Sequence, residues 1–213
     1  HRSCDGKPKS INVVNNYYKP GPATRPHVRR RIARIDDSMA KYGNFEPRWY
    51  IEGNVVEGEP TLTDDNWSGG VDFQGNTNEA KNRQRTPFPF APVTTHSAAD
   101  AYKLVLADVG ANRPERDVVD TRVLKELSDG KASRGEKGII DRQEEAGGWP
   151  LLRAAPAPDD TDSDGMPDAW EKEHGLDPND PADRNSHNID AAYSNLESYL
   201  NEMASGKEGR PQL

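Results

Sequence analysis

Short runs of β-branched and aromatic residues, each ending at turn-forming residues, dominate the first third of the chain. Ser10 to Tyr18 is the first run, and it leads into a Lys-Pro-Gly-Pro turn at 19–22. Arg48 to Gly58 repeats the arrangement as a short strand, a Gly-Asn corner and a second short strand. A third candidate strand lies near Trp67 to Phe73. The pattern predicts short strands separated by tight corners.

Asparagines recur at these predicted corners. Asn15, Asn16 and Asn54 each lie where a strand meets a turn, and asparagine tolerates the left-handed conformation that such corners need. Short strands that repeat with Asn or Gly corners are typical of the rungs of a parallel β-helix. Because two or three rungs are too few to be stable alone, we expect further rungs upstream of His1 in a longer protein.

A basic segment, Arg25 to Pro47, separates the first two predicted rungs. It holds a cluster of Arg25, His27, Arg29, Arg30, Arg31 and Arg34. Arginine forks suit carboxylates, so Arg29, Arg30 and Arg31 are candidate contacts to a polymer of uronic acids. The alternative is an insertion anchored by Val28, Ile32 and Ile35, whose arginines pair with the chain's own acids.

Helical periodicity begins after a proline-rich connector. Ser97 is a predicted N-cap for a helix that ends at Gly110, and a second helix is expected from about Glu115 to Ser128. In this second helix the inward positions would be Val119, Val123, Leu124 and Leu127. These helices are expected to cover an edge or face of the rungs. Two more short helices are predicted at about 168–174 and 194–203.

The tail contains a twelve-residue loop with the spacing of a calcium site. Acidic side chains occupy its positions 1, 3, 5, 9 and 12, position 6 is Gly165, and position 7 offers a backbone carbonyl. The candidate ligands are therefore Asp160, Asp162, Asp164, Met166, Asp168 and Glu171. The alternative is a solvated acidic linker. The prolines at 156 and 158 exclude an entering helix, so the loop does not belong to a full EF-hand.

Two further loops follow the calcium loop. The oxygen-rich loop from Asp177 to Asp183 could add ligands to the same ion or to a neighbouring one. The next segment, His187 to Glu197, lies where a paired loop would be expected. It lacks the acidic spacing and has Ser198 at the twelfth position, which indicates a degenerate second site.

Composition restricts the classes of function. The chain has 213 residues and a net charge of −8, which argues against a general nucleic-acid binder because neutralising phosphates requires a basic face. No run of apolar residues is long enough for a membrane span. Cys4 is the single cysteine, so no intrachain disulfide can form.

Two parts of the chain resemble known families. Ile11–Thr24, Trp49–Gly58 and Asp65–Trp67 resemble the late rungs of bacterial pectate lyases of polysaccharide lyase family 1. The segments 110–120 and 141–150 are similar to those that follow the β-helix in that family. The tail segments 160–171, 175–179 and 195–197 resemble the thrombospondin-type-3-like calcium modules fused to secreted bacterial enzymes.

The resemblance implies a mainly β fold: the last rungs of a right-handed parallel β-helix, followed by short helices and a calcium-loop tail. The expected domains are 1–92 for the rungs, 93–153 for a helical extension and 154–213 for the calcium module. It also implies a secreted or cell-surface protein whose partners are pectate or polygalacturonate and its own missing N-terminal part.

The implied chemistry is β-elimination, in which an arginine abstracts the C5 proton while Ca²⁺ bridges substrate carboxylates to enzyme acids. Alignment with the family's Arg-x-Pro-x-x-Arg pattern places the catalytic arginine at Arg2 and the second cation at Lys7, with Cys4 where proline is expected. The acids that hold the catalytic calcium should lie on earlier rungs, so we expect this chain alone to be inactive. The alternative is a non-catalytic β-helix surface or matrix protein that binds acidic polysaccharide or has a structural role.

Overall fold

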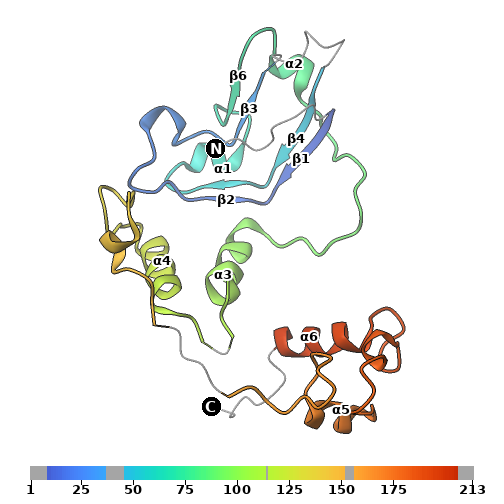
Figure 1. The fold of residues 1–213 in the computed structure, drawn as a ribbon. Coiled ribbons are helices and arrows are strands. Elements are labelled where there is room, and N and C mark those ends of the chain that lie inside the picture. The colour runs from blue at the N-terminus through green and yellow to red at the C-terminus, as the bar shows by residue number, and fades with distance from the viewer. Residues whose placement is uncertain (1–8, 37–45, 114, 152–155, 206–213) are drawn as a thin grey trace. The chain divides into compact units, whose positions relative to one another are not determined.

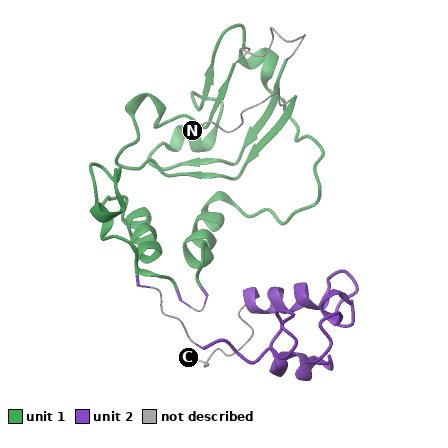
Figure 2. Ribbon diagram, viewed as in Figure 1, with its two compact units in different colours: residues 1–112, 116–150 green, residues 113–115, 151–213 purple. Residues whose placement is uncertain are grey.

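The computed structural model describes residues 9–36, 46–113, 115–151 and 156–205. The chain divides into two compact units (Figure 2). Unit 1 comprises residues 1–112 and 116–150, and unit 2 comprises residues 113–115 and 151–213. The expected division into three domains at 1–92, 93–153 and 154–213 stays a prediction. None of the described helices is both long and apolar enough to cross a bilayer.

Unit 1 begins with two successive coils of three strands each (Figure 1). The first coil consists of β1 (Ser10–Val14), β2 (Tyr17–Tyr18) and β3 (Ala33–Ile35), and the second of β4 (Arg48–Glu52), β5 (Val55–Val56) and β6 (Val71–Phe73). Each strand of the first coil pairs in parallel with its counterpart in the second, as β1-β4, β2-β5 and β3-β6. The second coil therefore stacks on the first.

The strand β3 corrects one expectation. The segment from Arg25 to Pro47 was expected to be an insertion between rungs, yet it contains the third strand of the first coil. Ile32, Ala33 and Ile35 are almost fully buried because β3 pairs with β6 and its apolar side chains enter the core. The main core lies inside the coils and consists of Ile11, Val13, Ile32, Ala33, Ile35, Trp49, Ile51, Val56, Leu62, Trp67 and Val71.

Asparagines form the corners between the first and second strands of each coil, as the sequence predicted. Asn15 adopts a left-handed conformation with φ of 53°. Gly53 occupies the equivalent corner of the next coil, where a Cβ atom would lie 2.0 Å from the Asn15 side-chain oxygen. Asn54 is fully buried, and its side-chain oxygen accepts hydrogen bonds from the backbone and side-chain nitrogens of Asn16 at 2.9 and 2.8 Å. The corners of the two coils are thus hydrogen-bonded to each other.

Four helices belong to unit 1: α1 (Pro60–Asp64), α2 (Glu79–Asn82), α3 (Ala98–Asp108) and α4 (Val118–Asp129). Ser97 caps α3 by accepting a hydrogen bond from the Asp100 backbone, as predicted. The helix α4 begins three residues later than expected because Asp117 is its N-cap and accepts from the backbone nitrogens of Val119 and Asp120. The described part of the unit also contains the short 3-10 helices η1 (Pro26–Val28) and η3 (Gln143–Ala146).

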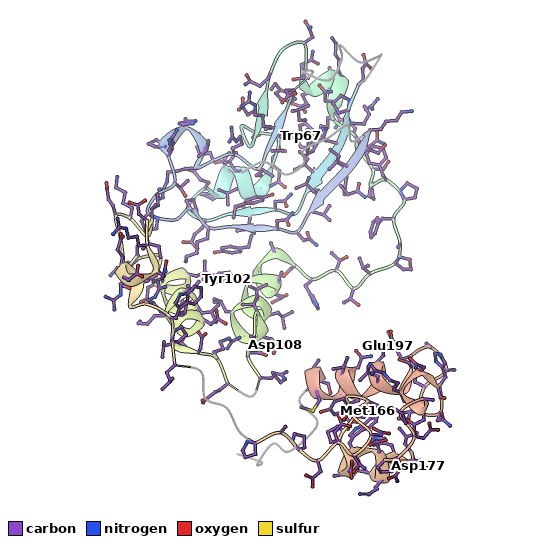
Figure 3. The ribbon with its side chains drawn as sticks, in the orientation of Figure 1. Trp67, Tyr102, Asp108, Met166, Asp177 and Glu197 are labelled. Carbon is purple, nitrogen blue, oxygen red and sulfur yellow. The ribbon has the colours of Figure 1, made fainter. Side chains whose placement is uncertain are left out.

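These helices cover less of the coils than expected. Tyr102 of α3 stacks on Tyr17 of β2 with ring centroids 4.5 Å apart, which joins α3 to the coils (Figure 3). In α4, however, Val123 and Leu127 are exposed rather than inward, because they line an open pocket that faces the turn at 19–24 instead of packing into the core.

Unit 2 contains α5 (Asp168–His174), the 3-10 helix η4 (Asp183–Asn185) and α6 (Asn195–Ser205). Trp170 of α5 packs between His174 and Tyr199, with ring centroids 4.1 and 5.1 Å away. Its indole nitrogen donates a hydrogen bond to Glu202 of α6 at 2.9 Å. The fold class was expected to be mainly β. The six described strands are short, however, so more of the described residues lie in helices than in strands.

Candidate functional site

The turn of the predicted calcium loop is held by its own carboxylates. The two Asp160 oxygens accept hydrogen bonds from the backbone nitrogens of Asp164 and Gly165, both at 3.1 Å. One Asp164 oxygen accepts from the Met166 backbone at 2.8 Å. Gly165 has φ of 99°, a conformation that side chains strongly disfavour, which explains the glycine at position 6. These bonds orient the remaining carboxylate oxygens toward the inside of the loop.

The described residues contain two groups of three acids whose ligand atoms all lie within 4.8 Å of one another. One group is Asp160, Asp162 and Asp164, and the other is Asp164, Glu171 and Asp183. Asp164 belongs to both groups, so they form one continuous acidic centre. Asp183 comes from outside the twelve-residue loop. Its loop was noted in the sequence, but spacing along the chain does not show which acid of that loop approaches Glu171.

Several oxygens in this centre are buried without any hydrogen-bond donor. They are one oxygen each of Asp162, Asp164 and Asp183 and both oxygens of Glu171. Glu171 is 0% exposed and Asp164 is 2% exposed. Buried carboxylates without donors are costly unless a cation compensates them. A hard cation with several oxygen ligands fits this donor set, and the two free oxygens of Glu171 fit the bidentate position 12.

Electrostatics in the centre also indicate a missing positive charge. Burial, followed by the charges of Asp162, Asp164, Asp183 and Asp168, raises the pKa of Glu171 to about 7. Burial and the neighbouring Asp164 also raise the pKa of Asp162. A bound divalent cation inverts this situation, because it stabilises the ionised carboxylates.

Asp168 and Met166, the other two predicted ligands, have visible structural roles. The Asp168 carboxylate accepts hydrogen bonds from the Thr161 backbone and hydroxyl, both at 2.8 Å, and these bonds lower its pKa. Asp168 thereby ties the loop to the start of α5, and it belongs to neither acidic group. The Met166 side chain is fully buried and anchors the loop. Metal coordination by either residue stays a prediction.

The segment from His187 to Glu197 is closed by an asparagine. Asn195 is fully buried, donates to the Asp183 carbonyl at 2.8 Å and accepts from the Asn188 backbone at 3.0 Å. Glu197 accepts from the Ser194 backbone at 2.8 Å in a capping box at the start of α6. Asn195 and Glu197 thus make hydrogen bonds within the protein.

The predicted substrate-binding arginines line a groove of unit 1 only in part. The groove contains Tyr17, Tyr18, Lys19, Arg25, Arg29 and Arg31. Arg30 instead pairs with Glu59 at 3.1 Å, and Arg31 pairs with Asp72 at 3.2 Å. The chain's own acids therefore engage Arg30 and Arg31, as the alternative interpretation of this cluster held. Arg29 is exposed and lines the groove.

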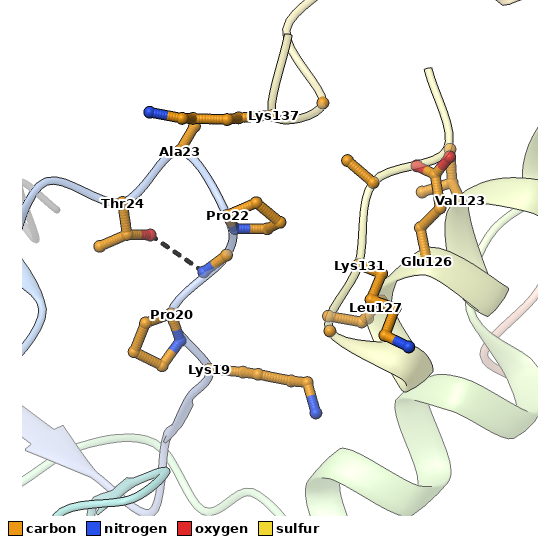
Figure 4. A pocket seen from close by; sticks show the side chains of 14 residues that line it. Lys19, Pro20, Pro22, Ala23, Thr24, Val123, Glu126, Leu127, Lys131 and Lys137 are labelled. Atoms are coloured by element: carbon orange, nitrogen blue, oxygen red, sulfur yellow. Dashed lines mark hydrogen bonds between the residues drawn. The ribbon is translucent and has the colours of Figure 1, made fainter. Parts of the chain in front are cut away.

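A second pocket adjoins this groove through Lys19 (Figure 4). Its walls are the turn at 19–24 on one side and α4 with the following loop on the other, and Lys131 and Lys137 add positive charge. Together the two hollows form a cationic surface with tyrosines at one end. The predicted catalytic residues Arg2 and Lys7 lie outside the described residues.

Comparison with known proteins shows a relationship to pectate lyases. No family model matches the chain. Probable pectate lyase C of Aspergillus fumigatus is 28% identical over 192 residues, which is 90% of this chain and 41% of that protein. The proteins of the same name from Aspergillus flavus and Aspergillus oryzae are 30% identical over 201 and 203 residues, 93% of this chain and 43% of each. These relatives are fungal, whereas the sequence resemblance pointed to bacterial lyases. The chain spans about two fifths of the length of the curated relatives it matches.

Proposed function

We propose that this chain is the C-terminal portion of a secreted polysaccharide lyase that cleaves pectate or polygalacturonate by calcium-assisted β-elimination. The relatives named pectate lyase C support this reaction class. The parallel stacking of two three-strand coils, with asparagines at the corners, supports the last rungs of a right-handed parallel β-helix. Among the described strands β1 pairs only with β4, and an upstream rung would continue the stack at the other edge of β1.

We also propose a second, non-catalytic calcium site in unit 2, and the observation that carries it is the set of buried carboxylate oxygens without donors there. Bound Ca²⁺ would supply the positive charge that these oxygens lack. Asp162, Asp164 and Glu171 would hold it, and Asp160 would complete the turn. We assign this tail site a structural role, because millimolar extracellular calcium suits a rigid site that adds stability.

The groove of unit 1 supports an acidic polysaccharide as the partner. Arg25 and Arg29 line this groove and offer positive charge, whereas Lys19 already pairs with Glu57 at 3.0 Å and the Tyr17 ring is stacked on Tyr102. In the proposed reaction Arg2 removes the C5 proton and Lys7 is an auxiliary cation. The acids that bind the catalytic calcium belong to the upstream part of the longer protein.

An absorbance assay on the longer protein tests the lyase function. Elimination creates a conjugated double bond, so ultraviolet absorbance should rise when polygalacturonate and Ca²⁺ are present. Replacing the proposed base, Arg2→Ala, should lower this rate by about 10²-fold or more. Arg34→Ala, which changes another arginine outside the proposed site, is the matched control and should keep the rate. No rise with any polyuronate would exclude the lyase.

The alternative function is a non-catalytic protein that binds acidic polysaccharide. Cys4, at the position where the lyase pattern has proline, is the observation that favours it. Calorimetry with oligogalacturonates distinguishes the two functions. Binding that Arg29→Gln weakens, without any unsaturated product, would support the alternative.

A further inference from the structure

The acid that completes the metal centre of unit 2 comes from outside its twelve-residue loop. Asp183 lies in η4, after α5, and a ligand atom of its carboxylate is within 4.8 Å of those of Asp164 and Glu171. We propose that Asp183 is a direct ligand of the bound cation, a calcium-class divalent ion, and that the ion cross-links the loop at 160–171 to the segment that carries α6. This inference rests on the calcium site proposed above.

The two oxygens of Asp183 have different surroundings. One accepts a hydrogen bond from the Asp177 backbone at 3.1 Å, which fixes the carboxylate at the end of its own loop. The other is buried and has no donor. A ligand atom of Asp183 lies within 4.8 Å of one of Glu171, which is 0% exposed and has no donor for either oxygen. Two carboxylates held this close repel each other, so this arrangement favours a shared cation over a purely structural role.

The charge count supports the same assignment. Asp162, Asp164 and Glu171 contribute free oxygens from the loop, and Asp183 adds a fourth carboxylate. Ca²⁺ accepts six to eight oxygen ligands, and affinity rises with the number of charged ones. The sequence indicated that the loop from Asp177 to Asp183 could add ligands to the ion, but it did not show which acid of that loop does so.

The backbone of Asp183 connects the centre to α6. Its carbonyl accepts a hydrogen bond from the Asn195 side chain at 2.8 Å. Asn195 is the first residue of α6, is fully buried, and also donates its backbone nitrogen to Ser186 at 2.8 Å. A cation held by Asp183 therefore stabilises the position of α6 as well as the loop. Trp170 and Glu202 provide a second, metal-independent link between α5 and α6.

The test compares two asparagine variants of the full chain. Asp183→Asn keeps an oxygen that can accept from Asp177 but removes the charge. Asp180→Asn is the matched control: Asp180 lies in the same segment, belongs to neither acidic group, and its oxygen accepts from the Ala182 backbone at 3.1 Å. Both variants change the net charge equally. Calcium affinity measured by titration calorimetry should fall roughly tenfold or more for Asp183→Asn. The calcium affinity of Asp180→Asn should stay within about twofold of the wild-type value, because this substitution removes only an exposed charge.

Melting temperature separates a ligand from a structural residue. A ligand role predicts that Asp183→Asn melts lower than wild type in calcium but not in chelator, where the substitution removes repulsion with Glu171. A purely structural role would lower both values. Hydrogen exchange measures the local effect on α6. Exchange in α6 should become faster when calcium is removed from the wild type by a chelator. It should also be faster in Asp183→Asn than in the wild type when calcium is present.

Each outcome is decisive. Equal calcium affinity in wild type and Asp183→Asn would overturn the assignment of Asp183 while leaving the loop site intact. If the wild-type chain does not bind calcium, the proposal of a calcium site in unit 2 is wrong as a whole. Neither result bears on the absorbance assay, so failure of this inference and failure of the lyase proposal can be told apart.

Discussion

The two units handle buried polar groups in opposite ways. In unit 1, Asn54 donates to the Val13 carbonyl at 2.7 Å and to Asn66 at 2.9 Å, and its oxygen accepts two bonds from Asn16. In unit 2, Glu171 is just as buried, yet neither of its oxygens has a donor. Neutral amides can satisfy each other within the protein because each both donates and accepts, whereas carboxylates only accept. Protein groups therefore satisfy the Asn54 network of unit 1, whereas no protein donor satisfies the Glu171 carboxylate of unit 2.

The largest effect should come from removing the proposed bidentate ligand. With free calcium at about 100 times the dissociation constant, the ion should stabilise unit 2 by about 3 kcal/mol. Glu171→Gln should abolish most of this gain, as measured by hydrogen exchange across 156–205 with and without calcium. Glu173→Gln, an exposed position on the same helix, is the control and should keep it. If calcium slows hydrogen exchange in Glu171→Gln as much as in the wild type, Glu171 is not the ligand that distinguishes unit 2 from unit 1.

A comparable but calcium-independent loss is expected in unit 1. Asn54→Ala removes a fully buried side chain that bonds to three neighbouring segments and leaves Asn16 and Asn66 with unpaired groups. The cost should be on the order of 3 kcal/mol. Urea unfolding followed by hydrogen exchange in 10–73 measures it. A loss that varies with calcium would contradict the assignment of this network to a metal-independent core.

The smallest effect is expected from the helix cap of α6, which separates metal-independent from metal-dependent stability within unit 2. Ser194 and Glu197 form a capping box at the start of α6, so Ser194→Ala should cost about 1 kcal/mol. Because no metal ligand is involved, the loss should be the same in calcium and in chelator. Thermal unfolding in both conditions checks this. A loss seen only with calcium would mean that the capped end of α6 depends on the ion.

The sequence by itself determined the local elements. Runs of β-branched and aromatic residues that end at turn residues predicted the strands at 10–18 and 48–58. Ser97 predicted the start of α3, and the acidic spacing with Gly165 predicted the metal loop. These features depend on dihedral preferences and on contacts between near neighbours, which the chain encodes within a few residues.

The tertiary structure decided the features that depend on distant contacts. It made Ala33–Ile35 a strand, because that short segment gains hydrogen bonds only by pairing with β6. It left Val123 and Leu127 exposed despite their helical spacing. It also brought Asp183 to Glu171, because the path of the chain after α5, and no spacing rule, decides which acid of the following loop reaches the centre.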